Sequence, residues 1–199
     1  AIPALAEEAV QPPILIDRHT HPEINADFAF AEDAELLEVI FPQMVDCDAI
    51  LLRCGGETML VDSCKQAYSE RIVNLCKQLG VTRIDKVVNT HPHEDHIGGF
   101  KDVIKEIEVG EFWICFPEDV NNHMKNAVKA ANRAGIPVKT YADGDVFTLG
   151  GATIEVWKME GKIGQMNDCS AQMMVRFGDR AFLMAADLQQ DGQKWLVET

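Results

Sequence analysis

Four residues with metal-ligating side chains stand within six positions of the chain: His91, His93, Asp95 and His96. Zinc and similar divalent ions bind imidazole nitrogen and carboxylate oxygen well. On a turning loop, ligands two positions apart can converge on one ion, while later neighbours reach a second. The spacing H-x-H-x-D-H therefore predicts two adjacent metal ions. An apolar run ending at Val88 precedes the motif and a glycine pair follows it, so we expect a loop between a strand and a tight turn.

The elements that must position this loop follow from the apolar patterning of the chain. Strands are predicted at residues 37–41, 49–53, 58–61, 87–89, 111–116, 138–141, 146–149, 153–158, 172–177 and 181–185. Helices are predicted at residues 69–79, 100–107, 119–134 and 189–197. Hairpins alternate with helices, and many strands are apolar on both faces. The sequence therefore predicts an α/β fold in which two sheets pack together with helices outside.

Length and charge limit the organisation and the partners. With 199 residues and 47% hydrophobic content, we expect one domain at residues 36–199, preceded by an acidic tail at residues 1–35. The net charge is −14, and residues 1–38 hold nine acids and one base. Without a block of Lys and Arg, strong nonspecific nucleic-acid binding is not expected, and bound cations would have to grip an anionic substrate. We expect a small-molecule or short phosphodiester substrate, and the oligomeric state stays open.

The N-terminal segment suggests export. Ala4-Leu5-Ala6, followed by two glutamates, resembles the small-residue cleavage site at the end of a secretory signal. It predicts a secreted or cell-surface protein, with a cytoplasmic protein as the alternative. No apolar run reaches the roughly 18 residues that a membrane-spanning helix requires, so no transmembrane segment is predicted.

Six cysteines lack any C-x-x-C pair, which argues against a zinc ribbon and against a thioredoxin-type redox site. We expect them to be small buried side chains. The Gly-Gly pair at residues 55 and 56 has the composition of a two-residue hairpin turn, which would place Cys47 opposite Cys64. We hypothesise a cross-strand disulfide between these two residues, which oxidising surroundings would permit.

The histidine motif, following a strand and followed by Gly98-Gly99, resembles that of the metallo-β-lactamase superfamily, which implies an αββα sandwich of two mixed sheets flanked by helices. The resemblance extends from about residue 36 to the end of the chain. Residues 46–51 and 56–62 resemble the opening hairpin of the branch found in competence DNA-uptake proteins. Asn167-Asp168-x-Ser170 and residues 182–187 resemble later strands of that branch.

The resemblance implies a dinuclear metal site. It places His91 and His93 on the first metal and Asp95 and His96 on the second, with Asp187 bridging both; Asp95 and His96 are the catalytic candidates. A carboxylate can link ions about 3.5–4 Å apart, and two ions together can lower the pKa of a shared water toward 7. We expect zinc, two ions per chain, although manganese and iron suit the same ligands. Alone, Asp187 could equally be a turn residue or a helix cap.

Two residues are candidates for supporting the ligands from behind. Asp62 ends an apolar strand and matches the acidic residue with which the family orients a ligating imidazole through its other nitrogen. Alternatively, it caps the following helix. Thr90 either supports the ligands or merely ends a strand.

The chain departs from the family pattern in two places. The family usually supplies another histidine between Asp95 and the bridging aspartate, but here His123 falls on a predicted helix. Asn167 and Asp168 occupy the comparable region, so Asp168 is a candidate oxygen ligand and Asn167 a candidate for orienting substrate.

The family also expects a final histidine well after the bridging aspartate, whereas Thr199 comes twelve residues after Asp187. We therefore expect the domain to be incomplete at its C-terminus. A second His-x-His pair, His19 and His21, falls in the acidic tail, where solvent exposure is the simpler expectation.

These features support several functions. The first is a metal-dependent hydrolase that acts through a metal-activated water, with a phosphodiester or another anionic ester as substrate. A noncatalytic, metal-stabilised binding module of the same fold is the alternative. Hydrolysis of a β-lactam or lactone is the third. It ranks low because the best-known zinc β-lactamases typically place Cys where this chain has Asp, so the chain resembles them less. A di-iron oxidoreductase ranks last, since that lineage tends to carry Glu at the position of His93.

Overall fold

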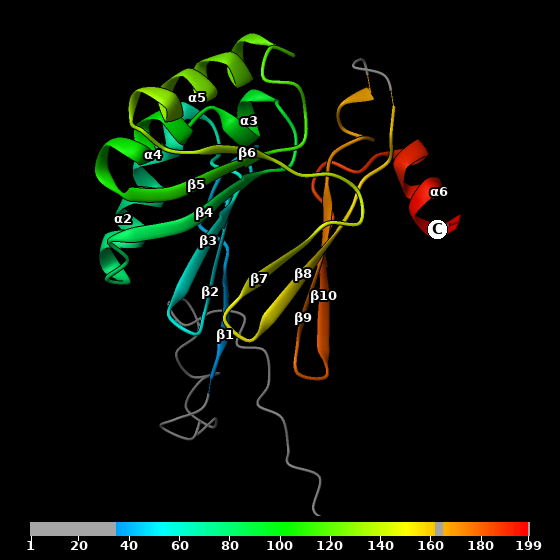
Figure 1. The fold of residues 1–199 in the computed structure, drawn as a ribbon, viewed down its shortest axis with the longest axis horizontal. Coiled ribbons are helices and arrows are strands. Elements are labelled where there is room, and N and C mark those ends of the chain that lie inside the picture. Colours follow the sequence, from blue (N-terminus) through cyan, green and yellow to red (C-terminus); the bar gives the residue numbers. More distant parts are fainter. Residues whose placement is uncertain (1–34, 162–164, 199) are drawn as a thin grey trace, which may run out of the picture. The chain divides into compact units, whose positions relative to one another are not determined.

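Two β-sheets pack face to face in residues 35–161 and 165–198, the part of the chain that the computed structural model describes (Figure 1). The first sheet has the strand order β1-β2-β3-β4-β5-β6 and the second the order β10-β9-β8-β7. The first sheet contains β1 (Leu37–Ile40), β2 (Ile50–Cys54), β3 (Glu57–Val61), β4 (Arg83–Asn89), β5 (Glu108–Ile114) and β6 (Val138–Thr140). The second contains β7 (Val146–Leu149), β8 (Ala152–Trp157), β9 (Gln172–Phe177) and β10 (Arg180–Met184).

The first sheet is mixed. Strands β1, β2 and β3 pair antiparallel, while β3, β4, β5 and β6 pair parallel. Parallel neighbours require crossover connections, and helices supply them: α2 (Ser69–Gln78), α4 (Phe100–Glu106) and α5 (Asn122–Arg133). A 3-10 turn, η1 (Gln66–Tyr68), precedes α2, and a single-turn helix, α3 (Glu94–Ile97), precedes α4. Figure 1 shows these helices together on the outer side of the first sheet.

Alternation along the strands divides the core into two layers. Successive side chains of a strand point to opposite faces of a sheet. Thus Leu51 and Val87 belong to the cluster that packs against the helices, whereas Leu52 and Val88 belong to the cluster between the two sheets. All four are at most 1% exposed, which explains why these strands are apolar on both faces.

The second sheet is an antiparallel meander followed by a helix. Its neighbours β7 and β8, β8 and β9, and β9 and β10 all pair antiparallel. The chain then passes through residues 185–189 into α6 (Gln190–Glu198), which lies on the opposite side of the molecule from α2 and α4 in Figure 1. The predicted fold class, two sheets flanked by helices, is confirmed.

The element boundaries differ from the predicted ones where side-chain contacts decide them. Helix α5 begins at Asn122 rather than at residue 119, because the Asn121 side chain accepts a hydrogen bond from the Met124 N–H at 2.9 Å and caps the helix. Strand β4 begins at Arg83, earlier than the predicted residue 87, since it pairs with β5 from its first residue. Helix α3 was not predicted, because a single turn carries too little periodicity.

Hairpin pairing brings the two cysteines of the predicted disulfide together as thiols. The register of β2 and β3 pairs Ile50 with Val61, and beyond the strands the Cys64 N–H donates to the Asp48 carbonyl at 2.8 Å. Burial, together with the neighbouring Cys47 thiol, raises the pKa of Cys64 to about 12. All six cysteines are free, so the structure contains the predicted juxtaposition without the disulfide.

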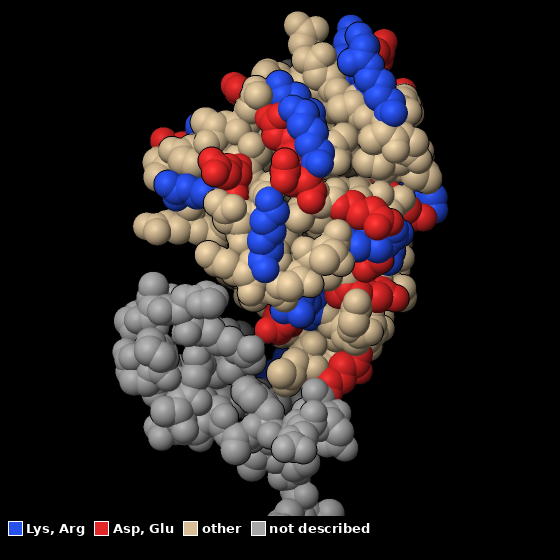
Figure 2. Space-filling view, turned by 90° about the vertical axis from the view of Figure 1, so that its left-hand side faces the viewer, with Lys and Arg blue, Asp and Glu red and all other residues tan. Residues whose placement is uncertain are grey.

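The face of the molecule shown in Figure 2 carries interspersed charges of both signs rather than one basic patch. Exposed ion pairs account for part of this pattern; Lys77, for example, lies 3.1 Å from Glu106. Such pairs contribute little stability individually. Among the described residues, no helix is both long and apolar enough to cross a membrane. The predicted acidic tail, with Ala4-Leu5-Ala6, His19 and His21, lies almost entirely outside the described residues.

Candidate metal centre

The histidine motif forms a loop and one helical turn at the end of β4. His91 follows the strand, His93 is the N-cap of α3, and α3 carries Asp95 and His96. The backbone N–H groups of His96 and Ile97 donate to the His93 carbonyl at 3.1 and 3.0 Å. This turn brings the imidazoles together: the ring centre of His91 lies 4.6 Å from that of His93 and 4.0 Å from that of His96.

The loop after β3 is clamped to this turn. The Ser63 N–H donates to the His96 carbonyl at 2.7 Å, and the Gly99 N–H donates to the Cys64 carbonyl at 2.9 Å. A Cβ atom on Gly99 would lie 2.2 Å from the Ser63 carbonyl oxygen, closer than atoms can approach. Glycine at this position therefore allows the close contact that holds the two loops together.

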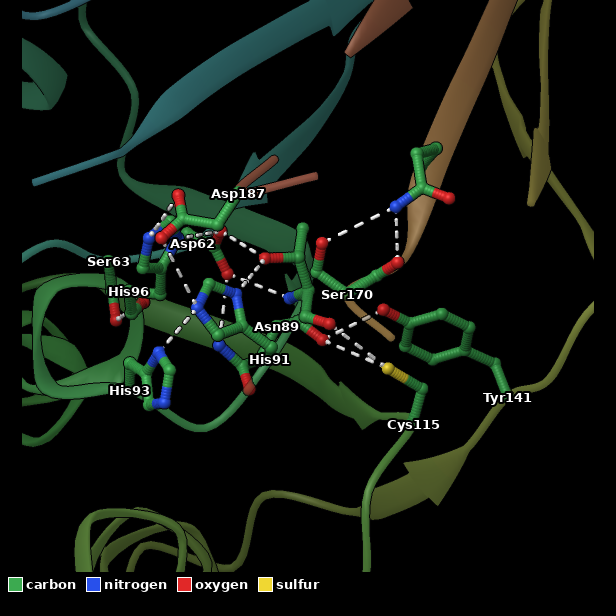
Figure 3. A network of polar contacts seen from close by, with 12 residues as sticks. Asp62, Ser63, Asn89, His91, His93, His96, Cys115, Tyr141, Ser170 and Asp187 are labelled. Atoms are coloured by element: carbon green, nitrogen blue, oxygen red, sulfur yellow. Dashed lines mark hydrogen bonds and ion pairs between the residues drawn. The ribbon is translucent and has the colours of Figure 1, made fainter. Parts of the chain in front are cut away.

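Asp62 organises the buried side of the site (Figure 3). Its Oδ1 accepts hydrogen bonds from the Asn89 side-chain amide at 2.9 Å and the Thr90 N–H at 2.8 Å. Its Oδ2 accepts from Thr90 Oγ1 at 2.6 Å and contacts His96 Nδ1 at 2.7 Å. The carboxylate is 3% exposed, and α2 begins without a side-chain cap. Asp62 thus contacts the histidine loop and not the helix that follows it.

These contacts determine which nitrogen of each histidine faces the centre. A carboxylate only accepts hydrogen bonds, so His96 donates its Nδ1 proton to Asp62 and directs Nε2 toward Asp187. Thr90 gives its hydroxyl proton to Asp62 and therefore accepts from His91 Nδ1, 3.2 Å away. Both histidines can then present the Nε2 lone pair, the donor that a metal ion requires.

Asp187 closes the group from the second sheet. It follows β10, and its Oδ1 lies 3.1 Å from His96 Nε2, while its Oδ2 lies 3.7 Å from His91 Nε2. One potential ligand atom from each of His91, His96 and Asp187 lies within 4.8 Å of the others. The histidines are buried, but the Asp187 side chain is 31% exposed, so the centre opens to solvent on the Asp187 side.

Three non-glycine residues around the centre have left-handed backbone conformations. Their φ angles are 58° at Asp62, 52° at Cys64 and 48° at Ala186. Such conformations cost on the order of 1 kcal/mol or more each and tend to occur at functional sites, where the surrounding structure enforces them. Here they turn Asp62 toward the histidines from one sheet and Asp187 from the other.

The electrostatics of the group favour a proton or a cation at its centre. Burial and the neighbouring His96 lower the pKa of His91 to about 4. Burial also disfavours charge on His96, but hydrogen bonds to Asp187 and Asp62 outweigh it and raise the pKa of His96 to about 11. The hydrogen bond from His96 holds the pKa of Asp187 below its usual range. A metal ion that binds His96 Nε2 must therefore displace a proton.

The other predicted site residues lie at different distances from this group. His93 is adjacent, with Nδ1 3.0 Å from His91 Nε2. Asp95 is outside the three-residue group, and its carbonyl accepts the Asp48 N–H at 3.1 Å. Asp168 Oδ1 accepts the Gly192 N–H at 2.9 Å in the first turn of α6, so this residue has a structural contact, and its role as a ligand stays a prediction. Asn167 Oδ1 is buried and has no hydrogen-bond partner among the residues that the structure describes.

Asp48 lies beside the centre although the sequence did not single it out as a site residue. Partial burial raises the pKa of its carboxyl, His96 lowers it, and the nearby Asp62, Asp187 and Asp95 raise it further. The only sequence signal was its place in residues 46–51, the segment that resembles the opening hairpin of the competence branch. Its approach to the histidine loop depends on β2 pairing with β3, which the local sequence does not reveal.

A second set of contacts holds the start of the histidine loop, from residues that follow β5 and β6 in the first sheet and from the residue before β9 in the second. Tyr141 donates its hydroxyl proton to the Asn89 carbonyl at 2.8 Å, and the Cys115 thiol contacts the Thr90 carbonyl at 3.2 Å (Figure 3). The Ala171 N–H donates to the same Thr90 carbonyl at 3.1 Å. Both sheets therefore fix the backbone that precedes His91.

The donor set fits a divalent metal ion. Two imidazoles with oriented Nε2 atoms and one carboxylate converge within 4.8 Å, and Asp62 supports one imidazole as buried carboxylates support metal-binding histidines. The fold and the site thus define a metal-binding α/β sandwich. The family model of the metallo-beta-lactamase superfamily matches residues 44–199, and the chain belongs to this superfamily.

Known proteins resemble the chain in sequence and in fold. A hydroxyacylglutathione hydrolase from Synechococcus sp. (strain WH7803) is 34% identical over 107 residues, which cover 52% of this chain and 34% of that protein. A HARLDQ-motif mutant of the metallo-beta-lactamase from Cronobacter sakazakii aligns with a TM-score of 0.55 at 19% identity, covering 74% of this chain and 60% of that one. The class B3 di-zinc metallo-beta-lactamase LRA-12 from an Alaskan soil metagenome aligns with a TM-score of 0.54 at 16% identity, covering 73% and 57%.

These matches extend over part of each known protein. The aligned region spans about a third of the curated relative and less than two thirds of the two solved structures. At such low identity the structural matches indicate the shared fold only. The resemblance to the competence branch stays a prediction.

Proposed function

We propose that the chain is a metal-dependent hydrolase that cleaves an acyl bond, such as that of an ester, thioester or lactam. The observation that carries this proposal is the convergence of His91, His96 and Asp187, with both histidines held so that Nε2 faces the group. The 34% identical relative is named as a hydrolase of an acylated glutathione, and the solved neighbours are named as β-lactamases. Both names describe hydrolysis at a carbonyl carbon.

The chain's own residues divide the work between binding and support. His91, His96 and Asp187 would hold the metal ion, and His93 and Asp95, on the same turn, are the candidates for a second ion. A divalent metal bound there lowers the pKa of a coordinated water toward 7 and polarises a carbonyl oxygen.

Asp62 and Thr90 keep the imidazoles in the tautomers that ligation requires. On the open side, Asp187 and Asp48 place negative charge next to the group, which strengthens cation binding. The same charge disfavours an anionic group that approaches the open side without a cation to meet it.

Metal content and turnover should be measured together on the full chain. We expect zinc, manganese or iron to bind, and the loaded protein to hydrolyse p-nitrophenyl acetate, a model thioester or a chromogenic cephalosporin. Bis(p-nitrophenyl) phosphate tests the phosphodiester expectation in the same assay. His96→Gln should lose both metal and turnover. His123→Gln, an exposed histidine on α5, is the matched control and should lose neither.

The outcomes separate the candidate functions. Metal binding without turnover of any substrate would favour the noncatalytic binding module. Turnover of the phosphodiester alone would replace the acyl substrate with the anionic one. Less than a tenth of an equivalent of metal after reloading, with unchanged activity in His96→Gln, would overturn the proposal.

A further inference from the structure

A pocket of about 420 Å³, whose lining side chains are apolar apart from Asp48 but whose surface is polar and apolar in comparable shares, lies near the metal centre. One wall is the segment between β1 and β2, with Phe41 and Met44, together with Ile50 at the start of β2, and the other is the end of β10, with Phe182 and Met184. The volume falls in the range of small-molecule sites, and such sites are mostly apolar with a few polar groups. The pocket therefore has the size and lining of a ligand site.

Two lining residues connect the pocket to the metal centre. Ala186 immediately precedes Asp187, whose carboxylate contacts both buried histidines. Asp48 lines the pocket, and its backbone N–H donates to the Asp95 carbonyl at 3.1 Å, on the turn that carries His96. The pocket therefore lies beside the backbone that carries Asp187 and beside the turn that carries His96.

Charge and exposure indicate what the pocket accepts. Of the described residues that line it, Asp48 is the only one with a formal charge, and no Lys or Arg is among them. A phosphate or carboxylate on the ligand would find no cationic side chain there and would meet a carboxylate. Phe41 and Leu183, which also lines the pocket, are 64% and 39% exposed, so they offer apolar surface that a ligand can cover.

We infer that this pocket binds an uncharged, apolar acyl group of the substrate and thereby selects neutral acyl compounds over anionic ones. The inference rests on the proposed hydrolase function for the metal end of the pocket. It narrows the substrate from any acyl compound to one with a medium-length aliphatic or similarly apolar acyl group. It also argues against the phosphodiester that the sequence suggested.

Hydroxamates of different chain length test the pocket by affinity rather than by turnover. Their head group binds zinc, so acetohydroxamate probes the metal centre alone and hexanohydroxamate adds four methylene groups. On the zinc-loaded full chain, calorimetry should show at least about tenfold tighter binding of hexanohydroxamate, since each buried methylene contributes favourably. Succinic acid monohydroxamate, with an anionic end, should bind no better than acetohydroxamate.

Substitutions that place a charge in the pocket should remove the gain with chain length. Leu183→Asp and Phe41→Asp change exposed side chains on opposite walls. A loss that appears in both variants therefore does not depend on the misfolding of one of them. Val146→Asp is the matched control, because Val146 is an apolar residue, 58% exposed, at the start of β7 and outside the pocket lining. The control should keep the full gain.

The possible outcomes distinguish the proposed acyl pocket from the proposed hydrolase function. Equal affinity for the two chain lengths, or an undiminished gain in both pocket variants, would overturn the pocket. A chain-length gain that the pocket variants lose, without hydrolysis of p-nitrophenyl acetate or hexanoate, would support the pocket and overturn the hydrolase. Failure of the protein to hold zinc would overturn both.

Discussion

The two sides of the metal centre are built differently. On the buried side, four hydrogen-bond donors converge on the Asp62 carboxylate, which is 3% exposed. On the open side, Asp187 is 31% exposed and directly follows Ala186, which lines the neighbouring pocket. A saturated carboxylate can hold an imidazole in place but has no lone pair left for a ligand. The comparison indicates that the buried side fixes the geometry and the open side is left for chemistry.

Removing the buried carboxylate should have the largest effect on stability. Asp62→Ala leaves the donors of Asn89, Thr90 and His96 without their acceptor, and we expect a loss of about 3–5 kcal/mol in the free energy of unfolding. Zinc affinity should also fall by about 10–100-fold, because the supporting contact of a metal-binding histidine disappears. Urea denaturation and a zinc competition titration measure the two effects.

The surface residue Asp179 provides the control for Asp62. Its side chain is 64% exposed and, among the described residues, forms an ion pair with neighbouring Arg180 only, so Asp179→Ala should change stability by less than about 0.5 kcal/mol. Equal effects of the two substitutions would mean that Asp62 does not organise the buried side.

The clamp between the two loops gives the next largest effect. Gly99→Ala places a Cβ atom 2.2 Å from the Ser63 carbonyl oxygen, and one loop has to move away. We expect a loss of about 1–3 kcal/mol, as for other overpacked sites, together with weaker zinc binding because Ser63 bonds the His96 carbonyl. Thermal unfolding with and without zinc tests this. Loss of stability with unchanged zinc affinity would show that the clamp does not position His96.

The pH dependence should differ between metal binding and folding. The pKa of His96 is raised to about 11, so this residue is protonated at neutral pH and zinc must displace one proton. Zinc affinity should therefore rise about tenfold per pH unit between pH 7 and 9. A group whose pKa is raised on folding stabilises the protein below its unfolded pKa, near 6.5, and the stabilisation declines as the pH rises toward 11.

In the presence of a chelator, the free energy of unfolding should consequently fall across pH 7–8, by at most about 1.4 kcal/mol per pH unit from His96. Above about pH 8 the cysteines of the unfolded chain begin to lose protons, whereas buried thiols such as Cys64, with a pKa of about 12, keep theirs and add to the fall, so the slope is measured below that pH. His96→Gln, which cannot titrate, should flatten the slope. A slope that persists in His96→Gln would assign the dependence to another group.

The residues that the sequence could predict are those whose neighbours in the chain carry the signal. The apolar run before His91 predicted the strand, and the spacing of the motif predicted that the histidines meet. Asp187 was found because a family pattern surrounds it, since its partners are about 90 residues away in the chain. Most strands likewise came from local apolar runs.

Residues that depend on distant contacts were not predictable in this way. Asp48 reaches the centre only because β2 pairs with β3 and carries the preceding loop to the histidine turn. The contact between the Asp168 carboxylate and the Gly192 N–H was equally hidden from the sequence. Neither contact has a periodic or compositional signature, because both arise from how separate elements pack.

Among substitutions in the metal centre, the smallest effect on stability should come from the open side, where Asp187→Asn keeps the shape of the side chain and removes its charge. In the metal-free protein we expect a change below about 1 kcal/mol, because the side chain is partly exposed and its ion pair with His96 is screened by solvent. Zinc binding should nevertheless be lost, since the amide is a poor ligand. Denaturation with a chelator, compared with Asp62→Ala in the same buffer, measures the contrast. Should Asp187→Asn destabilise the protein as much as Asp62→Ala, the open side would be structural, and the division between a supporting side and a reacting side would fail.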